Sequence, residues 1–454
     1  MVKKTHLKDT IFFLCSPSLG ILDNWLPIIW KLKKKQKDFK FIIIFPRSNF
    51  INQINLSNIL LILGSNVFDS IVFKSDSGLW LINDSLNKVK STNNLNIFEW
   101  FLLRIIKKLN RFPIFSIFSN LMQLCYKKFS KFLNKKNLFD WNFVENRGLC
   151  ILYDVYEESK HYNAELMKSF RELPKFSIQH GINISNGGLL ENKINVKDLV
   201  YRKDIKAYLF SSLELNLYKY EYAIHQSCLE VVGVPRHSFD WIDFIKSNLP
   251  KNKNDIDSVL DDSIFIISRP SGTTYFPHDR KKKALENIKS LAWNDLKKNI
   301  VVKLHPKEQK DGIYEEVFGR DTYGHKWIYS DLHPFVLGEV SEFAISFFSG
   351  VVLDMLALGV PTIEYLDLRG IPEFDNYESL RDKSGNPVLS YRYLDLVLGA
   401  SDYKELKFYA SEIINNRDNI ISKLLTRYNE IFPRINHIND KISKDIIRKV
   451  LRKY

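Results

Sequence analysis

The chain lacks the features that mark secreted, zinc-binding or membrane-spanning proteins. Its four cysteines are scattered without a Cys-x-x-Cys pair, which favours buried free thiols in a reducing compartment over disulfides or a zinc site. No apolar stretch reaches the roughly 18 uncharged residues that a bilayer span needs. No small-residue cleavage site follows the N-terminal apolar run, so we do not expect a signal peptide. Together these absences predict a cytoplasmic protein.

Internal repeats and low-complexity tracts are also absent from the 454 residues. A chain of this length is too long for one ordinary core and fits two domains of roughly 150–250 residues each. Apolar residues make up 45% and charged residues 26%, which are ordinary values for a globular protein. The net charge of +14 is compatible with nucleic acid, an anionic membrane surface or an anionic small substrate as partner.

Much of the positive charge is concentrated in residues 97–141, which contain nine basic and only two acidic residues among many aromatic ones. We interpret 90–141 as a helical insertion and leave two roles open for it. Its helices can dock on anionic lipid, which would bring the protein to the inner face of the cell membrane, or they can simply cover a sheet. No recognised nucleic-acid module accompanies the charge, so nucleic acid is not an expected partner.

Short apolar runs alternate with helical periodicity along the chain, a pattern typical of parallel sheets wrapped by helices. We expect an N-terminal domain over 1–246, a polar linker, a second α/β domain over 262–402, and terminal helices over 403–454 that can cross back. Two Rossmann-like, doubly wound domains facing a cleft describe the GT-B architecture, in which ligands lie at the carboxyl ends of the strands. Strands are expected at 10–15, 39–45, 70–73, 149–153, 175–179, 207–210, 230–232, 263–268, 299–304, 343–346 and 361–365.

The first candidate binding motif is a His-Pro step at the end of a buried strand. His305 and Pro306 lie between Lys303 and Lys307. Proline ends the strand and holds the histidine at the sheet edge, where histidine can donate to a phosphate oxygen and lysine adds positive charge. The alternatives are a histidine that caps a turn and a Lys303 buried in its strand.

The second motif is a strand that runs through a serine-rich turn into a helix. We expect Ser349 to cap the helix and Gly350 to allow a ligand close to the free N–H groups of its first turn. Gly359 and Pro361 then end the helix and begin the next strand, which carries Glu364. Taken alone, any Rossmann crossover can have this form.

The order and spacing of these motifs resemble the bacterial surface-polysaccharide transferases of the GT-B fold. A His-Pro step, followed about forty residues later by a Ser-capped helix ending in Gly-x-Pro, occurs in the CMP-Kdo- and sialic-acid-type transferases and in the CDP-glycerol-type polyol-phosphate transferases. The Gly-Val-Pro-Arg step at 233–236 resembles their domain-closing segment, and 269–274 lies where they place a phosphate-facing loop. The resemblance covers roughly 231–365.

This resemblance implies a donor site without metal or cofactor. No Asp-x-Asp motif follows a strand, so we expect metal independence, with a nucleotide-activated sugar as co-substrate. The chain lacks a Thr-Trp-Arg-Gly-Thr-Pro segment, which favours sugar transfer over polyol-phosphate transfer. By analogy Glu364 reaches a ribose hydroxyl, while the other implied nucleotide-binding residues are Arg269, Ser271, Gly272, Thr273, Lys303, His305, Pro306, Ser349 and Gly350.

Four residues of the N-terminal half are candidates for acid–base catalysis. Asp23 follows the first strand, where the Kdo transferases that the chain resembles carry a catalytic acid. Asp154 ends another strand, with Glu158 close behind, and carboxylates there can accept a proton. His180 ends a third strand in a Gln-His-Gly step that resembles such steps in polysaccharide transferases. For the carboxylates the alternative is an ordinary solvated first turn of a helix.

The function expected from the sequence is glycosyl transfer onto a surface glycan or lipid-linked glycan. The expected donor is a CMP-linked Kdo- or sialic-acid-like ulosonate. Three alternatives stay open, namely a CDP-glycerol- or ribitol-type polyol-phosphate transferase, a nucleotide-sugar epimerase of the same fold, and a non-catalytic carbohydrate-assembly partner that binds the donor without turnover.

Overall fold

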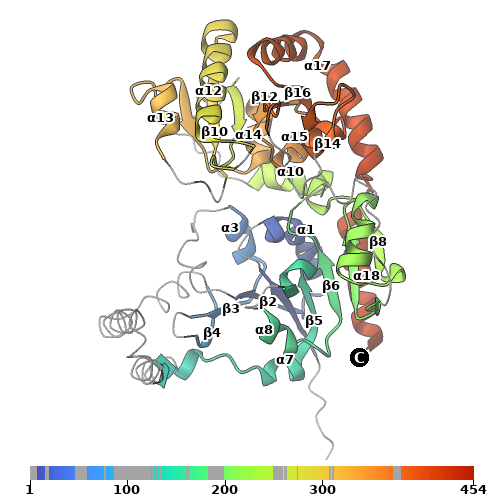
Figure 1. The fold of residues 1–454 in the computed structure, drawn as a ribbon. Helices are drawn as coiled ribbons and strands as arrows, with labels where there is room; N and C mark the ends of the chain where they lie inside the picture. Colours follow the sequence, from blue (N-terminus) through green and yellow to red (C-terminus); the bar gives the residue numbers. More distant parts are fainter. Residues whose placement is uncertain are drawn as a thin grey trace, which may run out of the picture.

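The computed structural model describes residues 8–15, 20–46, 59–75, 78–85, 124, 127–128, 130–131, 135–159, 163–181, 199–248, 259, 263–273, 275–305, 308, 311–371 and 380–453. Two domains are stacked, each built on a largely parallel sheet covered by helices (Figure 1). The predicted α/β class with two Rossmann-like domains is confirmed. Among the helices described, none has the length and apolar character needed to cross a membrane.

The N-terminal domain contains an eight-stranded sheet in the order β4-β3-β2-β1-β5-β6-β7-β8. All neighbours are parallel except β3 and β4, which pair antiparallel at one edge. The central strands β1 and β5 are buried along their whole length, which is why they read as continuous apolar runs. The strands are β1 Thr10–Leu14, β2 Lys40–Phe45, β3 Ser70–Lys74, β4 Trp80–Asn83, β5 Gly148–Tyr153, β6 Lys175–Ile178, β7 Ile205–Leu209 and β8 Leu229–Val231.

Helices and short helical turns connect these strands. Helix α1 carries an acidic residue in its first turn and three lysines in its last, which complements the helix dipole. The helices are α1 Gly20–Lys35, α3 Ile59–Ser65, α7 Asn142–Arg147, α8 Ala164–Lys168 and α10 Phe239–Asn248, with the turns η2 Lys135–Asn137, η3 Val155–Ser159, η4 Ser212–Glu214, η5 Leu217–Glu221, η6 Gln226–Cys228 and η7 Pro235–His237.

The C-terminal domain has a six-stranded parallel sheet in the order β11-β10-β9-β12-β13-β16, and a two-stranded hairpin, β14-β15. The short strands β11 and β16 at its two edges were not predicted. The strands are β9 Ser263–Ile267, β10 Asn299–Lys303, β11 Trp327–Tyr329, β12 Ser341–Ser346, β13 Thr362–Tyr365, β14 Leu380–Arg381, β15 Pro387–Val388 and β16 Leu398–Ala400; the helices are α12 His278–Lys289, η8 Ser290–Leu296, α13 Ile313–Phe318, α14 Pro334–Val340, α15 Val351–Leu358 and α16 Ser390–Tyr393.

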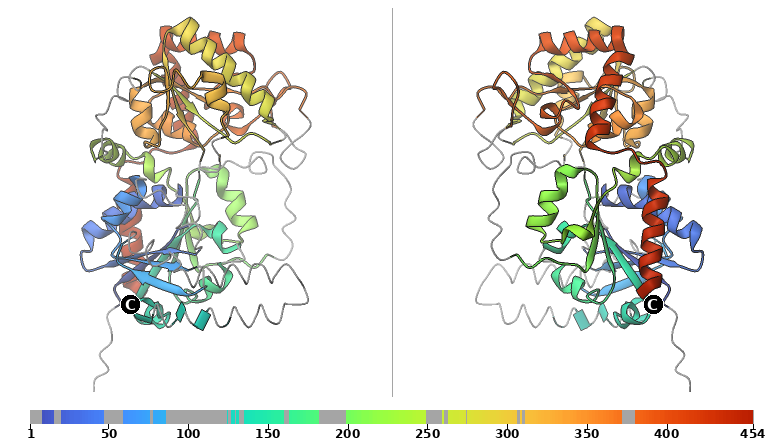
Figure 2. Two further views of the ribbon diagram at one scale, coloured as in Figure 1. Left: turned by 90° about the vertical axis from the view of Figure 1, so that its left-hand side faces the viewer. Right: turned by 90° about the vertical axis from the view of Figure 1, so that its right-hand side faces the viewer.

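Two long helices end the chain, α17 Tyr403–Ile431, which kinks at Asn416, and α18 Ile438–Lys453. Figure 2 shows them in red, running from the C-terminal domain down the side of the N-terminal one. Asp445 of α18 accepts a hydrogen bond from Tyr208 of β7 at 2.6 Å. Lys35 of α1 donates to Ser443 at 2.8 Å. The last helix therefore belongs spatially to the domain that begins the chain.

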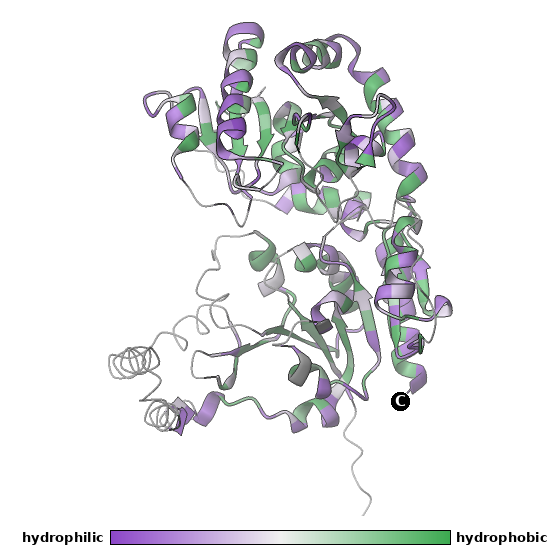
Figure 3. Ribbon diagram, in the orientation of Figure 1, coloured by the Kyte–Doolittle hydropathy of each residue, from purple (hydrophilic) through white to green (hydrophobic). Residues whose placement is uncertain are grey.

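Apolar residues concentrate on the strands and on the helix faces that cover them (Figure 3). One buried apolar cluster continues from one domain into the other, and Trp241 of α10 and Phe335 of α14 belong to it. The predicted insertion at 90–141 lies outside the described residues except for 124, 127–128, 130–131 and 135–141.

Candidate active site

The register of the C-terminal sheet aligns four residues at the carboxyl ends of its central strands. Lys303 is level with Ile267, Ile267 with Ser346, and Ser346 with Glu364. Residues that are level on neighbouring parallel strands lie side by side on one face of the sheet. Three polar residues from well-separated parts of the sequence thus come to one edge, where ligands bind in open α/β sheets.

Helix α15 starts directly after this edge. We expected Ser349 to cap it, but the cap is Gly350 and the helix begins at Val351. Phe348 before this turn adopts a left-handed conformation (φ +79°), and the Gly350 backbone is already helical, with φ −58° and ψ −17°. The Ser349 hydroxyl accepts a long hydrogen bond from the Val351 N–H at 3.4 Å.

Arg269 lies against this same turn. Its guanidinium donates to the Phe348 carbonyl at 2.8 Å, and its central carbon lies over the Phe348 ring, 5.0 Å from the ring centroid. The turn before α15 and the loop after β9 therefore meet. In that loop Gly272 has φ +95°, and its N–H donates to the Phe276 carbonyl, so the segment holding Ser271 and Thr273 is a tight turn.

Glu364 is a buried carboxyl at the end of β13. Its Oε2 atom and the neighbouring Ser346 Oγ have no hydrogen-bond partner among the described residues. Burial raises the pKa of Glu364 to about 7, although the positive charges of Arg392 and Arg269 oppose the rise. A buried, unsatisfied carboxyl of this kind indicates a site for a polar ligand.

The loop after β10 is anchored by two charged residues that the sequence did not single out. The Glu308 carboxylate accepts from the His305 N–H at 3.2 Å and from the Ser268 hydroxyl at 2.7 Å. Lys281 of α12 forms an ion pair with Glu308 and donates to the Arg269 carbonyl at 3.1 Å. In the sequence Lys281 is one lysine in a run of three, and only the tertiary structure shows it buried.

Lys303 is directed away from this loop. Its ammonium donates to the Leu332 carbonyl at 2.7 Å, and burial lowers its pKa to about 8. A contact between Lys303 and a donor phosphate therefore stays a prediction. Pro306 lies outside the described residues.

In the N-terminal domain, Asp154 and His180 form a pair at the carboxyl ends of β5 and β6. Asp154 Oδ2 lies 2.6 Å from His180 Nδ1 and also accepts from the His180 N–H at 2.9 Å. Asp154 Oδ1 accepts from the Tyr156 N–H at 3.0 Å. The aspartate is fully buried, whereas a quarter of the His180 side chain is exposed. Both residues were predicted, but their pairing was not.

Glu158 and Asp23, the other two predicted acids, have different surroundings. Glu158 forms an ion pair with Arg202 at 2.5 Å and accepts from the Tyr153 hydroxyl at 2.6 Å. Asp23 lies in the first turn of α1, 3.5 Å from Arg236 and 3.4 Å from His333 of the C-terminal domain. The structure does not bring either acid into the Asp154–His180 pair.

A further carboxyl, that of Glu214, supports the His180 turn and was not predicted from the sequence. Glu214 is buried and accepts from the Phe210 and Ser211 N–H groups at 2.5 and 3.2 Å. Once the Gln179 amide is oriented to satisfy its neighbours, it donates to Glu214. Burial raises the pKa of Glu214 to about 8, and the nearby Asp154 charge adds to the rise.

A buried ion pair between Arg236 and Asp354 joins the two domains. Arg236 of η7 binds Asp354 of α15 through two nitrogens, at 2.8 and 3.2 Å. His237 Nε2 lies 2.6 Å from the same carboxylate, and its Nδ1 lies 2.5 Å from the Tyr428 hydroxyl. The arginine of the predicted Gly-Val-Pro-Arg step thus binds the helix whose N-terminus faces the candidate donor site.

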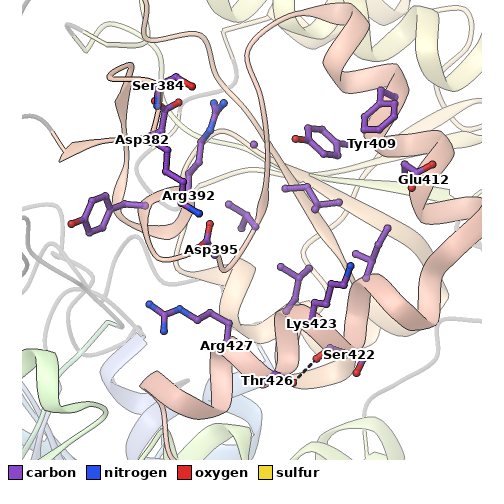
Figure 4. A pocket seen from close by; sticks show the side chains of 18 of the residues that line it. Asp382, Ser384, Arg392, Asp395, Tyr409, Glu412, Ser422, Lys423, Thr426 and Arg427 are labelled. Carbon is purple, nitrogen blue, oxygen red and sulfur yellow. Dashed lines mark hydrogen bonds between the residues drawn. The ribbon is translucent and has the colours of Figure 1, made fainter.

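A separate groove of about 960 Å³ lies at the edge of the C-terminal sheet, beside β16 (Figure 4). Arg392, Asp395, Arg427 and Tyr409 line it, and the two halves of α17 form one of its sides. None of the predicted nucleotide-binding residues lines it. In the described part of the chain, no group of three or more histidine, cysteine or acidic side chains is arranged to hold a metal ion.

Comparison of the whole structure with solved structures identifies the architecture. The wall teichoic acid polymerase TagF, in a variant solved with CDPG, has a TM-score of 0.51 at 12% sequence identity, covering 98% of this chain and 89% of its own. The chain has the GT-B fold. The GT-B likeness extends to a UDP-GlcNAc 2-epimerase from Neisseria meningitidis bound to UDP-GlcNAc, with a TM-score of 0.48, 14% identity and 98% and 100% coverage of the two chains. It also extends to a glycosyltransferase from Rickettsia africae, with a TM-score of 0.45, 12% identity and the same coverages.

At these identities the likeness concerns the fold alone. No protein-family model matches this GT-B chain, and no curated protein sequence matches it.

Proposed function

We propose that this GT-B protein transfers a group from a nucleotide-activated donor to a hydroxyl of a glycan acceptor. The observation that carries the proposal is the Asp154–His180 pair at the carboxyl edge of the N-terminal sheet. The hydrogen bond to Asp154 holds Nδ1 as the protonated nitrogen and leaves Nε2 as the basic one. A histidine held in this way is suited to act as a general base.

In the proposed reaction, His180 takes the proton of the acceptor hydroxyl as the acceptor oxygen attacks the donor. The new bond forms to the donor's reacting centre, the bond to the leaving phosphate oxygen breaks, and the nucleotide departs with the electron pair. Asp154 stabilises the imidazolium that forms, since its buried carboxylate is 2.6 Å from Nδ1.

The C-terminal edge is the proposed donor site. The N-terminus of α15 and Arg269 would hold the phosphate, with His305 on the neighbouring loop. Glu364 and Ser346 would bind the ribose hydroxyls, which supplies the partners that Glu364 Oε2 and Ser346 Oγ lack among the described residues. Ser271, Gly272 and Thr273 would complete the phosphate side.

The donor proposed first is a CMP-linked ulosonate, since the chain lacks the Thr-Trp-Arg-Gly-Thr-Pro segment of the polyol-phosphate group. The second candidate is CDP-polyol phosphate transfer, favoured by the likeness to TagF, which was solved with CDPG. The epimerase alternative would need no acceptor. Docking of 97–141 on anionic lipid, at the inner face of the cell membrane, stays a prediction because most of that segment lies outside the described residues.

A donor panel tests the proposal. CMP-Kdo, CMP-sialic acid, CDP-glycerol and UDP-GlcNAc are each added to the protein, and thermal stabilisation and nucleotide release are measured. One donor class is expected to stabilise the fold and to be consumed only when a glycan acceptor is present. If none of the four binds, the proposal is wrong.

Substitution of the proposed base is the sharper test. His180→Gln is expected to reduce transfer by about 10²- to 10⁴-fold while leaving donor affinity nearly unchanged, because only the proton acceptor is lost. Half-buried His225, which caps η6 away from the Asp154–His180 pair, supplies the matched control His225→Gln, which should transfer normally. His305→Ala should abolish transfer through the loss of donor binding instead. Normal turnover by His180→Gln contradicts the proposal.

A further inference from the structure

Two adjacent residues of α1 donate hydrogen bonds to the backbone directly before each member of the Asp154–His180 pair. Asn24 Nδ2 donates to the Gln179 carbonyl at 3.0 Å. Trp25 Nε1 donates to the Tyr153 carbonyl at 3.3 Å. Asn24 and Trp25 are both fully buried. A single turn of one helix thus tethers the strand ends that carry both residues of the proposed base.

The same turn of α1 is also connected to the donor side. Arg236 Nη1 lies 3.5 Å from Asn24 Oδ1 and 3.5 Å from Asp23 Oδ2. Its Nε and Nη2 atoms, on another edge of the guanidinium, donate to the Asp354 carboxylate in the first turn of α15. The Arg236 guanidinium is therefore shared between the helix that faces the donor phosphate and the helix that holds the base.

Burial makes this connection stiff. Arg236 and Asp354 are each less than a tenth exposed, and His237 holds the same carboxylate from a second side. Separating the two members of a buried ion pair leaves uncompensated charges, so the contact between Arg236 and Asp354 is costly to break. His333 also contacts Asp23 from the C-terminal domain, which adds a second contact between α1 and that domain.

We infer that Asn24 and Trp25 are positioning residues, and that Arg236 couples them to α15. Helix α1 would align the His180–Asp154 pair with the donor. A nucleotide bound at the N-terminus of α15 would then change the surroundings of the His180 ring. The coupling between donor and base rests on the proposed function, whereas the tethering of the pair by α1 does not. Misplacement of a reacting group by about 1 Å costs on the order of 100-fold in rate.

Matched variants separate positioning from simple loss of stability. Asn24→Ala is compared with Ser341→Ala, because Ser341 is another buried polar residue whose side chain donates to a backbone carbonyl, that of Leu337, and it lies on β12, outside α1 and η7. Trp25→Phe is compared with Trp241→Phe, because the Trp241 indole is equally buried and its N–H has no hydrogen-bond partner among the described residues. Trp25→Phe keeps the ring in place should Asn24→Ala fail to fold.

The first readout needs no ligand. The ¹³C resonance of the His180 ring is recorded in protein with labelled histidine and assigned by its loss in His180→Gln. We expect Asn24→Ala and Trp25→Phe to move this resonance and the two controls to leave it in place. Asp354→Asn, made in the other domain, should move it as well. An unmoved His180 resonance in Trp25→Phe and Asp354→Asn overturns the inference, whatever the protein binds.

The second readout uses CMP, CDP and UDP as probes. In the unsubstituted protein, a nucleotide that binds should move the His180 resonance, and Asn24→Ala should suppress this movement while its Kd for that nucleotide stays within about twofold. Asn24→Ala should lower the kcat of transfer and leave donor affinity unchanged. Binding without any movement of His180 refutes the coupling and leaves the proposed donor site intact. Absence of binding by all three refutes the proposed function, and the ligand-free comparison still decides the positioning role.

Discussion

Glu364 illustrates how a single side chain links stability to the proposed donor site. Burial raises its pKa to about 7 from an ordinary value of 4.5. Between these pH values the unfolded chain has lost the proton and the folded protein still binds it. Stability therefore falls as pH rises through this window, by roughly 3 kcal/mol in total.

Glu364→Gln is expected to remove this fall, because an amide does not titrate. Denaturant unfolding at pH 4.5, 6 and 7.5 measures the free energy of unfolding. Over this range the substituted protein should lose less of it than the unsubstituted one. Glu172→Gln supplies the control, since its side chain is almost fully exposed and its removal should leave the slope unchanged. An unchanged slope in Glu364→Gln would show that this carboxyl is ionised throughout.

At the scale of elements, the segment that leads from β8 to η7 depends on one glycine. Gly233 has φ +81°, and a Cβ atom there would lie 2.0 Å from the Pro433 carbonyl oxygen in the connection between α17 and α18. A side chain would force this crossing apart and displace Arg236 three residues later. The close approach explains why the predicted domain-closing step contains glycine at this position.

Gly233→Ala is therefore expected to destabilise the protein by about 1–3 kcal/mol more than Gly78→Ala. Gly78 has a similar φ of +76°, but a Cβ atom there meets nothing within 4 Å. The two variants share the cost of a left-handed residue and differ only in the clash. Denaturant midpoints compare them, and equal midpoints would show that the crossing relaxes freely.

At the scale of the whole molecule, the two ends of the sequence stabilise one domain. Ile446 of α18 is fully buried, whereas Leu451 on the same helix is 57% exposed. Ile446→Ala should cost about 2–5 kcal/mol and Leu451→Ala less than about 0.5 kcal/mol. Amide hydrogen exchange should show loss of protection in α1 with Ile446→Ala, because α18 packs there. Loss confined to α18 would contradict this packing.

The sequence predicted the central parallel strands well, because buried strands between helices are continuous apolar runs bounded by polar turns. The edge strands β4, β11 and β16 were missed, since each has only three or four residues and forms no recognisable period. The three-residue edge strand β8 was predicted. The cap of α15 was predicted at Ser349 and lies at Gly350, a difference of one residue that local residue patterns do not resolve.

The sequence by itself determined the two doubly wound domains and the strand ends that carry polar residues, since alternating apolar periodicity and local turn chemistry decide both. It also indicated Asp154 and His180 separately, each from its place at a strand end. Only the tertiary structure decided that these two pair, that Glu158 binds Arg202 instead, and that Lys281 and Glu308 form a buried ion pair whose carboxylate accepts from the His305 N–H. Such pairings depend on strand order and on helices far apart along the chain, and no local pattern of residues encodes that order.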